Sequence, residues 1–189
     1  MKNLLSISLV AIVAGCGSAE GSAPDEAEVT GTTQEAWTNP SQWSGSSSVL
    51  QPGAMTGGNL NLPVCRVSYA GVWHPGKYWK AQCLFEYGGQ GLAAGPTSNG
   101  RTSVVPTFQT LLNDGNFRWY RMGYSTYIPP NAVQGGSSGG QPIGVCYVNG
   151  PDYNYHVGKY WADGCNIEYS GTGKHLITTN NDVYILTWR

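Results

Sequence analysis

The sequence has few charged residues and no sustained helical pattern of apolar residues. Only 11% of its 189 residues are Asp, Glu, Lys or Arg, and the formal net charge is −1. From residue 40 onward, nine Lys and Arg residues are spread along the chain together with six Asp and Glu residues. Without a basic cluster, an excess of three positive charges does not indicate a nucleic-acid partner.

The sequence also lacks the side-chain spacings that hold metal ions or carry out hydrolysis. It contains no Cys-x-x-Cys pair, and no second histidine or carboxylate lies at ligand spacing from His74 or His156. A GxSxG pattern occurs at Gly135–Gly139, but it lies in a Gly/Ser-rich loop, whereas a nucleophile elbow needs a preceding strand and a following helix. No carboxylate pair suggests an acid and a base. We therefore predict no metal site, no cofactor and no enzymatic activity.

The first residues predict export. The apolar run from Leu4 to Val13 is too short to span a membrane and is typical of a signal peptide. It ends in VAGC, which resembles the bacterial lipobox, so residues 1–15 are the expected signal peptide and Cys16 the expected site of lipidation. The mature protein would then be anchored to the membrane by lipid, in the outer membrane because Gly17 is not the aspartate that often retains lipoproteins in the inner one. An ordinary signal with an incidental cysteine is the alternative.

A second segment, residues 16–39, is acidic and rich in small residues. It holds five carboxylates and no Lys or Arg. Such a composition cannot bury enough apolar surface to fold, and its charges repel one another. We expect a flexible tether between the lipid anchor and the folded part.

The remaining chain is an internal duplication. HPGKYWKAQCLFEYGG (residues 74–89) recurs as HVGKYWADGCNIEYSG (residues 156–171), with nine identities at an offset of 82. Upstream, LQPGAMTGG matches IPPNAVQGG, and PVCRV matches GVCYV. The first repeat with its connecting segment spans residues 40–127 and the second spans residues 128–189. Because each repeat is small, the two are expected to share one core.

The folded part is predicted to be all-β, with short antiparallel strands in two pseudo-symmetric tandem repeats. Runs rich in β-branched and aromatic residues indicate strands at PVCRVSY, QCLFEY, FRWYRM, GVCYV, CNIEY and DVYILTW. Gly, Ser, Asn and Pro separate these runs at intervals of about ten residues, as turns require.

The period of two along a strand predicts which side chains are exposed. In CLFEY it directs Cys83, Phe85 and Tyr87 inward and Glu86 outward, and in CNIEY it directs Glu168 outward. The Gly-Lys pairs at Lys77 and Lys159 read as turns that lead into strands. An exposed lysine at a turn should cost less than about 0.5 kcal/mol of stability when it is truncated.

Four cysteines occur in matching places, two in each repeat. Three disulfide pairings are possible, but the duplication favours Cys65 with Cys83 and Cys146 with Cys165. A zinc site formed by all four cysteines is the alternative.

The order of these motifs resembles the DM-nine repeat family. The matching segments are IPPNAVQGG, GVCYV, HVGKYWADGCNIEYSG and VYILTW in the second copy, with the first copy reading similarly. The family includes tandem-repeat lectins that bind mannose, and its repeats also occur in natterin-like proteins. The resemblance implies antiparallel sheets in two pseudo-symmetric repeats. It also implies that the lysine of the Gly-Lys pair, Lys77 or Lys159 here, contacts the sugar.

The resemblance is incomplete at one site position. The family's aspartate after its Gly-Gly segment is absent, and Asn59 and Ser137 occupy the matching neighbourhoods. An amide or hydroxyl can still bond a sugar hydroxyl, but more weakly than a carboxylate does. This chain therefore departs from the mannose-binding lectins of the family at a position that contacts the sugar.

These observations lead to two hypotheses from different classes. The first is a cell-surface lipoprotein with a two-site, lectin-like module, in which Lys77 with Glu86, and Lys159 with Glu168, bind a mannose-like or other surface glycan. The second is a structural or protein-interaction module whose repeated residues serve folding alone. An enzyme acting on cell-wall polymers is a weaker third option. The sequence does not indicate an oligomeric state.

Overall fold

The computed structural model describes residues 41–58, 60–150, 152–153 and 156–189. These residues fall within one unit of the chain, Gln34–Arg189. The expected signal peptide, the lipidation site Cys16, the tether and Asn59 lie outside the described residues. No helix in the described part of the chain is long and apolar enough to cross a membrane.

The described residues form an all-β fold, as predicted from the sequence. The strands are β1 (Thr56–Gly57), β2 (Leu62–Tyr69), β3 (Val72–Trp79), β4 (Gln82–Tyr87), β5 (Gln90–Ala94), β6 (Gln109–Thr110), β7 (Phe117–Arg121), β8 (Gln134–Ser138), β9 (Gln141–Asn149), β10 (Val157–Trp161), β11 (Gly164–Tyr169), β12 (Thr172–Ile177) and β13 (Asp182–Trp188). Each of the six apolar runs named above lies mainly in a strand, because β-branched and aromatic side chains suit a pleated, buried surface.

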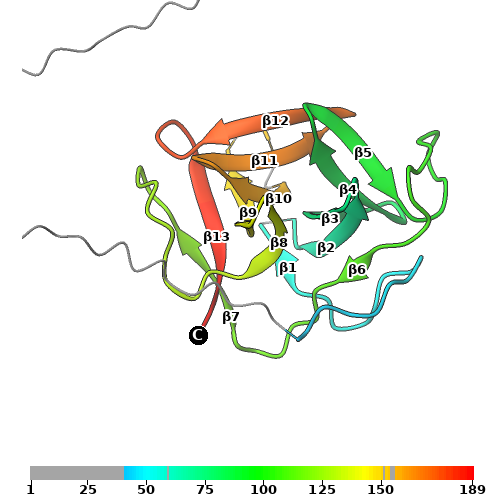
Figure 1. Ribbon diagram of the computed structural model, residues 1–189, viewed down its shortest axis with the longest axis horizontal. Coiled ribbons are helices and arrows are strands. Elements are labelled where there is room, and N and C mark those ends of the chain that lie inside the picture. Colours follow the sequence, from blue (N-terminus) through cyan, green and yellow to red (C-terminus); the bar gives the residue numbers. More distant parts are fainter. Residues whose placement is uncertain (1–40, 59, 151, 154–155) are drawn as a thin grey trace, which may run out of the picture. The chain divides into compact units, whose positions relative to one another are not determined.

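The two repeats lie next to each other in one antiparallel sheet. Its strand order is β1-β2-β3-β4-β5-β12-β11-β10-β9-β13-β7, with β6 on β2 and β8 on β9. Strands β2 to β5 follow one another as hairpins, and β9 to β12 do the same in the second copy (Figure 1). The two series meet where Gln90 of β5 pairs with Thr172 of β12.

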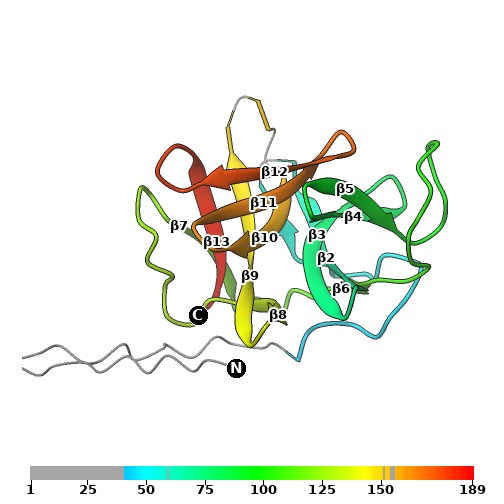
Figure 2. The same cartoon turned by 45° about the horizontal axis from the view of Figure 1, so that its top comes forward.

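The sheet curves so that the two copies also face each other. Strand β3 packs against β10, and β4 packs against β11. After the view is turned by 45°, the hairpins β4–β5 and β11–β12 still lie side by side (Figure 2). One apolar cluster contains Val64 from the first copy together with Val145 and Val157 from the second. The two copies therefore share a core.

One disulfide lies within each copy, as the duplication predicted. Cys65 of β2 bonds Cys83 of β4, and Cys146 of β9 bonds Cys165 of β11, with Cα separations of 6.0 and 5.9 Å. In each case a third strand lies between the two bonded ones. Because neighbouring strands are about 4.8 Å apart, two strand spacings in a flat sheet would give roughly 9.6 Å. The sheet is therefore sharply curved at β3 and β10.

The predicted turns at the Gly-Lys pairs are wrong, because both pairs lie inside strands β3 and β10. Gly76 is opposite Cys65, where the sheet is curved, and a Cβ on Gly76 would overlap the carbonyl oxygen of Leu84. Gly158 is opposite Cys146 and is just as crowded by the carbonyl oxygen of Asn166. A glycine inside a strand often marks such a bend or close backbone approach.

The predicted alternation of faces in β4 and β11 is only partly correct. Cys83 and Phe85 are buried as expected, but Tyr87 is 39% exposed. Glu86 and Glu168, which were expected outside, are buried. The period of two assumes that one face of a strand meets water, whereas β4 and β11 pack against each other.

Candidate functional site

Each repeated lysine binds the glutamate of the other copy. The Nζ atom of Lys77 lies 2.8 Å from Oε2 of Glu168, and the Nζ atom of Lys159 lies 2.9 Å from Oε2 of Glu86. The Lys77 and Glu168 side chains are only 3% and 2% exposed. The prediction that each lysine and the glutamate of its own repeat are exposed side by side is therefore wrong, because all four are buried and each lysine contacts the glutamate of the other repeat. The lysines reach across because β3 faces β10 in the curved sheet.

Each glutamate is held in place by the turn that follows it. The Oε1 atom of Glu86 accepts a hydrogen bond from the Gly89 amide, and that of Glu168 accepts one from the Gly171 amide, both at 2.8 Å. Lys159 also donates to the backbone oxygen of Glu86 at 3.2 Å. Both carboxylate oxygens are thus satisfied, which a buried charge requires.

The two hairpins interlock around these glutamates. A Cβ on Gly91 would lie 2.7 Å from the Cγ atom of Glu168, and a Cβ on Gly173 would lie 2.6 Å from that of Glu86. The Gly173 amide donates to the backbone oxygen of Gly89 at 2.8 Å, and the Gly91 amide donates to that of Gly171 at 3.1 Å. The repetition of Lys, Glu and Gly therefore has a structural cause, because these residues join the two copies.

The charge states follow from burial and from these neighbours. Burial raises the pKa of Glu168, but Lys77, the Gly171 amide and Arg101 outweigh that effect and lower the pKa below its usual value. Burial lowers the pKa of Lys77 to about 8, although Glu168 opposes this shift. At neutral pH both members of the pair are therefore charged. Burial and then Lys77 lower the pKa of His156, which is neutral at that pH.

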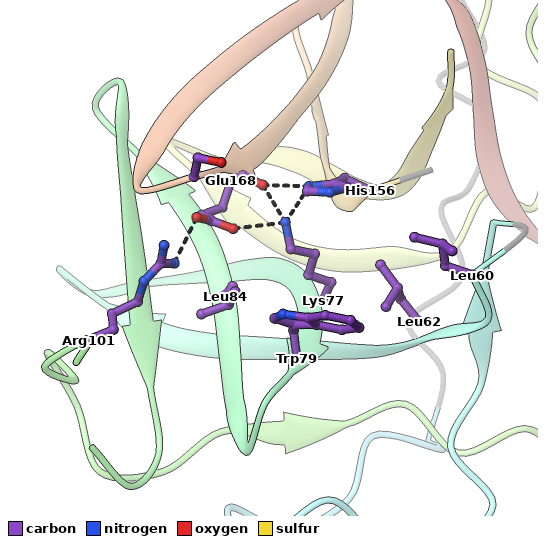
Figure 3. Close-up of a pocket in the computed structure, with 9 residues that line it drawn as sticks. Leu60, Leu62, Lys77, Trp79, Leu84, Arg101, His156 and Glu168 are labelled. Carbon is purple, nitrogen blue, oxygen red and sulfur yellow. Dashed lines mark hydrogen bonds and ion pairs between the residues drawn. The ribbon is translucent and has the colours of Figure 1, made fainter. Parts of the chain in front are cut away.

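A pocket of about 250 Å³ opens beside the Lys77–Glu168 pair. Its lining residues are Leu60, Leu62, Lys77, Trp79, Leu84, Arg101, His156, Glu168 and Ser170. Figure 3 shows the Trp79 ring on one side of the pocket, with Glu168 across from it and Lys77 between them. Trp79 is 47% exposed. The pocket thus combines an accessible aromatic face with charged hydrogen-bonding groups.

Arg101 closes one side of this pocket. Its Nη1 atom lies 2.7 Å from Oε1 of Glu168, and its side chain is 29% exposed. Arg101 belongs to residues 95–108, which connect β5 to β6. The matching connection in the second copy, between β12 and β13, spans only residues 178–181 and has no counterpart of Arg101. The pocket is therefore lined by both copies, and Arg101, which closes it, comes from a segment that the second copy lacks.

The predicted site residues fall in three places. Lys77 and Glu168 line the pocket, and Lys159 and Glu86 form the second ion pair. Ser137 is exposed in β8 and does not line the pocket. The remaining candidate, Asn59, lies outside the described residues.

Sequence reasoning missed Trp79 and Arg101. Trp79 recurs as Trp161, but recurrence did not reveal that Trp79 is exposed while Trp161 is partly buried. Arg101 has no repeated partner, so the duplication carries no signal for it. In the sequence, the sign that the two copies differ here was the longer connecting segment that follows the first copy.

Among the described residues, no group of three or more His, Cys, Asp or Glu side chains could hold a metal ion. The four described cysteines are all consumed by the two disulfides. The chemistry offered by the pocket is therefore hydrogen bonding, ion pairing and aromatic contact.

No protein-family model matches the chain, and no curated protein matches its sequence. A similar solved structure is that of the nematode sperm cell motility protein MFP2B, with a TM-score of 0.48 and 16% sequence identity. The match covers 74% of this chain and 39% of that chain, so this chain spans about two fifths of the length of that protein. At this level of similarity, the match carries no inference about function.

Proposed function

We propose that this module binds carbohydrate without catalysis, through the pocket beside Trp79. The observation that carries the proposal is the exposed Trp79 ring opposite the buried Lys77–Glu168 pair. A sugar ring has an apolar C–H face and a rim of hydroxyl groups. An indole ring covers the first, and charged groups form strong hydrogen bonds with the second.

The pocket size and the sequence resemblance support this proposal. A volume of about 250 Å³ lies just below the range of roughly 300 to 1,000 Å³ for pockets that hold drug-sized ligands, which suits one sugar ring. In the DM-nine lectins that the sequence resembles, the matching lysine contacts the sugar, and Lys77 lines the pocket here. We therefore propose both that the chain is related to that family and that its ligand is a carbohydrate.

A second binding centre remains part of the proposal. Lys159 and Glu86 form the equivalent ion pair between the two copies. Their surroundings differ, because Asn166 replaces Leu84 and Trp161 is only partly exposed. We expect this centre to bind more weakly, so the binding stoichiometry measured by calorimetry distinguishes one site from two.

The structural hypothesis is the second candidate, and the crossed ion pairs favour it. They explain why Lys and Glu are repeated without invoking a ligand. The two hypotheses differ at Trp79, whose exposed ring contributes little to the core. A purely structural module needs no such residue and binds no glycan.

The experiment uses the full chain with Cys16→Ser, which removes the expected lipidation. This protein is screened against a broad glycan panel and compared with the same chain carrying Trp79→Ala. The control is Tyr127→Ala, which truncates another exposed aromatic residue outside the pocket. We expect Trp79→Ala alone to abolish binding while the melting temperature stays nearly unchanged. Absence of any glycan hit, or binding that survives Trp79→Ala, rejects the proposal.

We also propose that the chain is displayed at the cell envelope through lipid on Cys16. This rests on the VAGC motif alone. Mass spectrometry of the mature N-terminus tests it, and we expect a lipidated Cys16 as the first residue. A mature protein that begins elsewhere and partitions into the aqueous phase of a detergent extraction shows the anchor to be absent.

A further inference from the structure

A second hollow adjoins the pocket beside Trp79. Its volume is about 180 Å³, and it is lined by Trp79, Lys80, Gln82, Leu84, Asn99 and Arg101. Trp79, Leu84 and Arg101 line both hollows. We call the two together the Trp79 groove, with an inner hollow at Lys77 and an outer hollow at Lys80.

The groove has an excess of positive charge. Its lining includes the cations Lys77, Lys80 and Arg101, but only one carboxylate, that of Glu168. Glu168 is buried and already paired with Lys77 at 2.8 Å. His156 adds no charge at neutral pH, because burial lowers its pKa. Lys77 and Arg101 thus share the single carboxylate of Glu168, and the lining of the groove carries a net positive charge.

Arg101 is held by the fold rather than being a freely moving surface residue. Its backbone amide donates to the oxygen of Ser98 at 3.0 Å, which closes a tight turn. Its backbone oxygen accepts a hydrogen bond at 3.0 Å from the side chain of Gln82, which is 2% exposed. Among the described residues, the guanidinium donates to Glu168 through Nη1. It therefore keeps further donors for a ligand in the outer hollow.

We propose that the Trp79 groove binds an acidic sugar chain, with one ring against Trp79 in the inner hollow and the anionic group of the next sugar between Arg101 and Lys80. This inference rests on the proposed carbohydrate-binding function and names the class of ligand. The planar guanidinium fork of Arg101 matches the two oxygens of a carboxylate or sulfate. Lys80, whose Nζ atom lies 6.0 Å from the centre of the Trp79 ring, supplies a second, more exposed charge.

The test compares matched acidic and neutral glycans on the full Cys16→Ser chain by titration calorimetry. The first arm uses galacturonate, glucuronate and mannuronate oligomers and the methyl ester of each. The second arm uses a sulfated galactan oligosaccharide and its desulfated form, so that carboxylate and sulfate ligands are told apart. We expect at least one acidic member to bind about tenfold more tightly than its neutral partner. Added salt should weaken the acidic member more, because it screens exposed charges.

Variants at the outer hollow identify the charges responsible. Arg101→Gln should remove most of the preference for the acidic glycan, and Lys80→Gln should reduce it about threefold. The matched control is Arg118→Gln, which removes an exposed positive charge in β7 that lines neither hollow. Lys80 is exposed, so its variant remains informative even if Arg101→Gln lowers stability.

The outcomes separate this inference from the proposed function. If esters and acids bind equally and Trp79→Ala abolishes both, carbohydrate binding stands and the acidic ligand is rejected. If Arg101→Gln and Arg118→Gln weaken binding to the same extent, the groove does not select the charge, and the inference fails. If an acidic glycan binds the Trp79→Ala variant as tightly as the wild type, it is held by charges on the surface outside the Trp79 groove, and both proposals fail. Both also fail if no glycan binds.

Discussion

The ammonium group of Lys77 lies 2.8 Å from the carboxylate of Glu168, although 91 residues separate them along the chain. The equivalent ion pair joins Lys159 of the second copy to Glu86 of the first. In neither copy does this lysine pair with the glutamate of the same copy, so each copy needs the other to form these two ion pairs. The two ion pairs therefore make correct docking of the copies a condition for stability.

The first prediction concerns Lys77. Lys77→Met leaves the carboxylate of Glu168 buried without its lysine, and removing one partner of a buried pair typically costs about 3 to 5 kcal/mol. Arg101 retains part of the compensation, so we expect a loss in the free energy of unfolding near the lower end of that range. Urea denaturation measures it. The control Lys174→Met, at an exposed position in β12, should cost less than about 0.5 kcal/mol.

This expectation reverses the one drawn from the sequence, in which Lys77 was an exposed residue at a turn. The double variant Lys77→Met with Glu168→Leu should recover much of the lost stability, because it no longer buries an unpaired charge. A loss below about 1 kcal/mol for Lys77→Met alone would falsify the structural role of the pair.

The second prediction concerns the interlocked hairpins. Gly91→Ala places a Cβ 2.7 Å from the Cγ atom of Glu168 and equally close to the backbone of Gly171. Because backbone atoms cannot move away easily, we expect overpacking to cost roughly 1 to 3 kcal/mol in urea denaturation. Gly45→Ala is the control, since nothing lies within 4 Å of a Cβ there. Equal stability of the two variants contradicts the interlocking.

The third prediction is a loss of stability in acid. The pKa of Glu168 is lower in the folded protein than its usual value of 4.5, so the unfolded chain takes up this proton first. The contribution of Glu168 to stability is therefore fully present above about pH 4.5 and is lost as the pH falls through the folded-state pKa. Denaturation of the wild type and of Glu168→Gln should differ by a constant amount at pH 5 to 7. That difference should shrink below pH 4.5, and one that is unchanged down to pH 2.5 argues against an ionised Glu168.

The fourth prediction concerns His74. Its ring packs against Phe85, its Nε2 atom donates to the backbone oxygen of Tyr69, and its Nδ1 atom is buried without a hydrogen-bond partner among the described residues. Burial, and then the nearby charge of Lys159, lower its pKa from 6.5 to about 4. We expect the ring resonances, assigned with His74→Gln, to show no titration in NMR spectra between pH 5.5 and 7.5.

The sign of the His74 effect is the same as for Glu168. Because the folded-state pKa is the lower one, the contribution of a neutral His74 to stability is present above pH 6.5 and is lost between about pH 6.5 and 4. A midpoint of titration near 6.5 in the folded protein places the ring in water and contradicts its burial.

Much of the fold could be predicted because its causes are local. The strands follow from short β-branched and aromatic runs, each of which needs only a few neighbouring residues to be recognised. The disulfide pairing followed from the duplication, since a unit used twice keeps each bond within itself. The prediction that Glu86 and Glu168 are exposed was wrong, because alternation shows that a strand has two faces but not what covers them.

The sequence by itself determined that this protein contains two copies of a disulfide-linked β unit, and which residues those units have in common. Only the tertiary structure decided that Lys77 binds Glu168 rather than Glu86. The partner of a charge depends on the curvature that brings β3 onto β10, and residues 91 apart carry no local signal of that approach. It also decided where the pocket forms, because Arg101 and Trp79 meet only when residues 95–108 fold back beside the β4 hairpin.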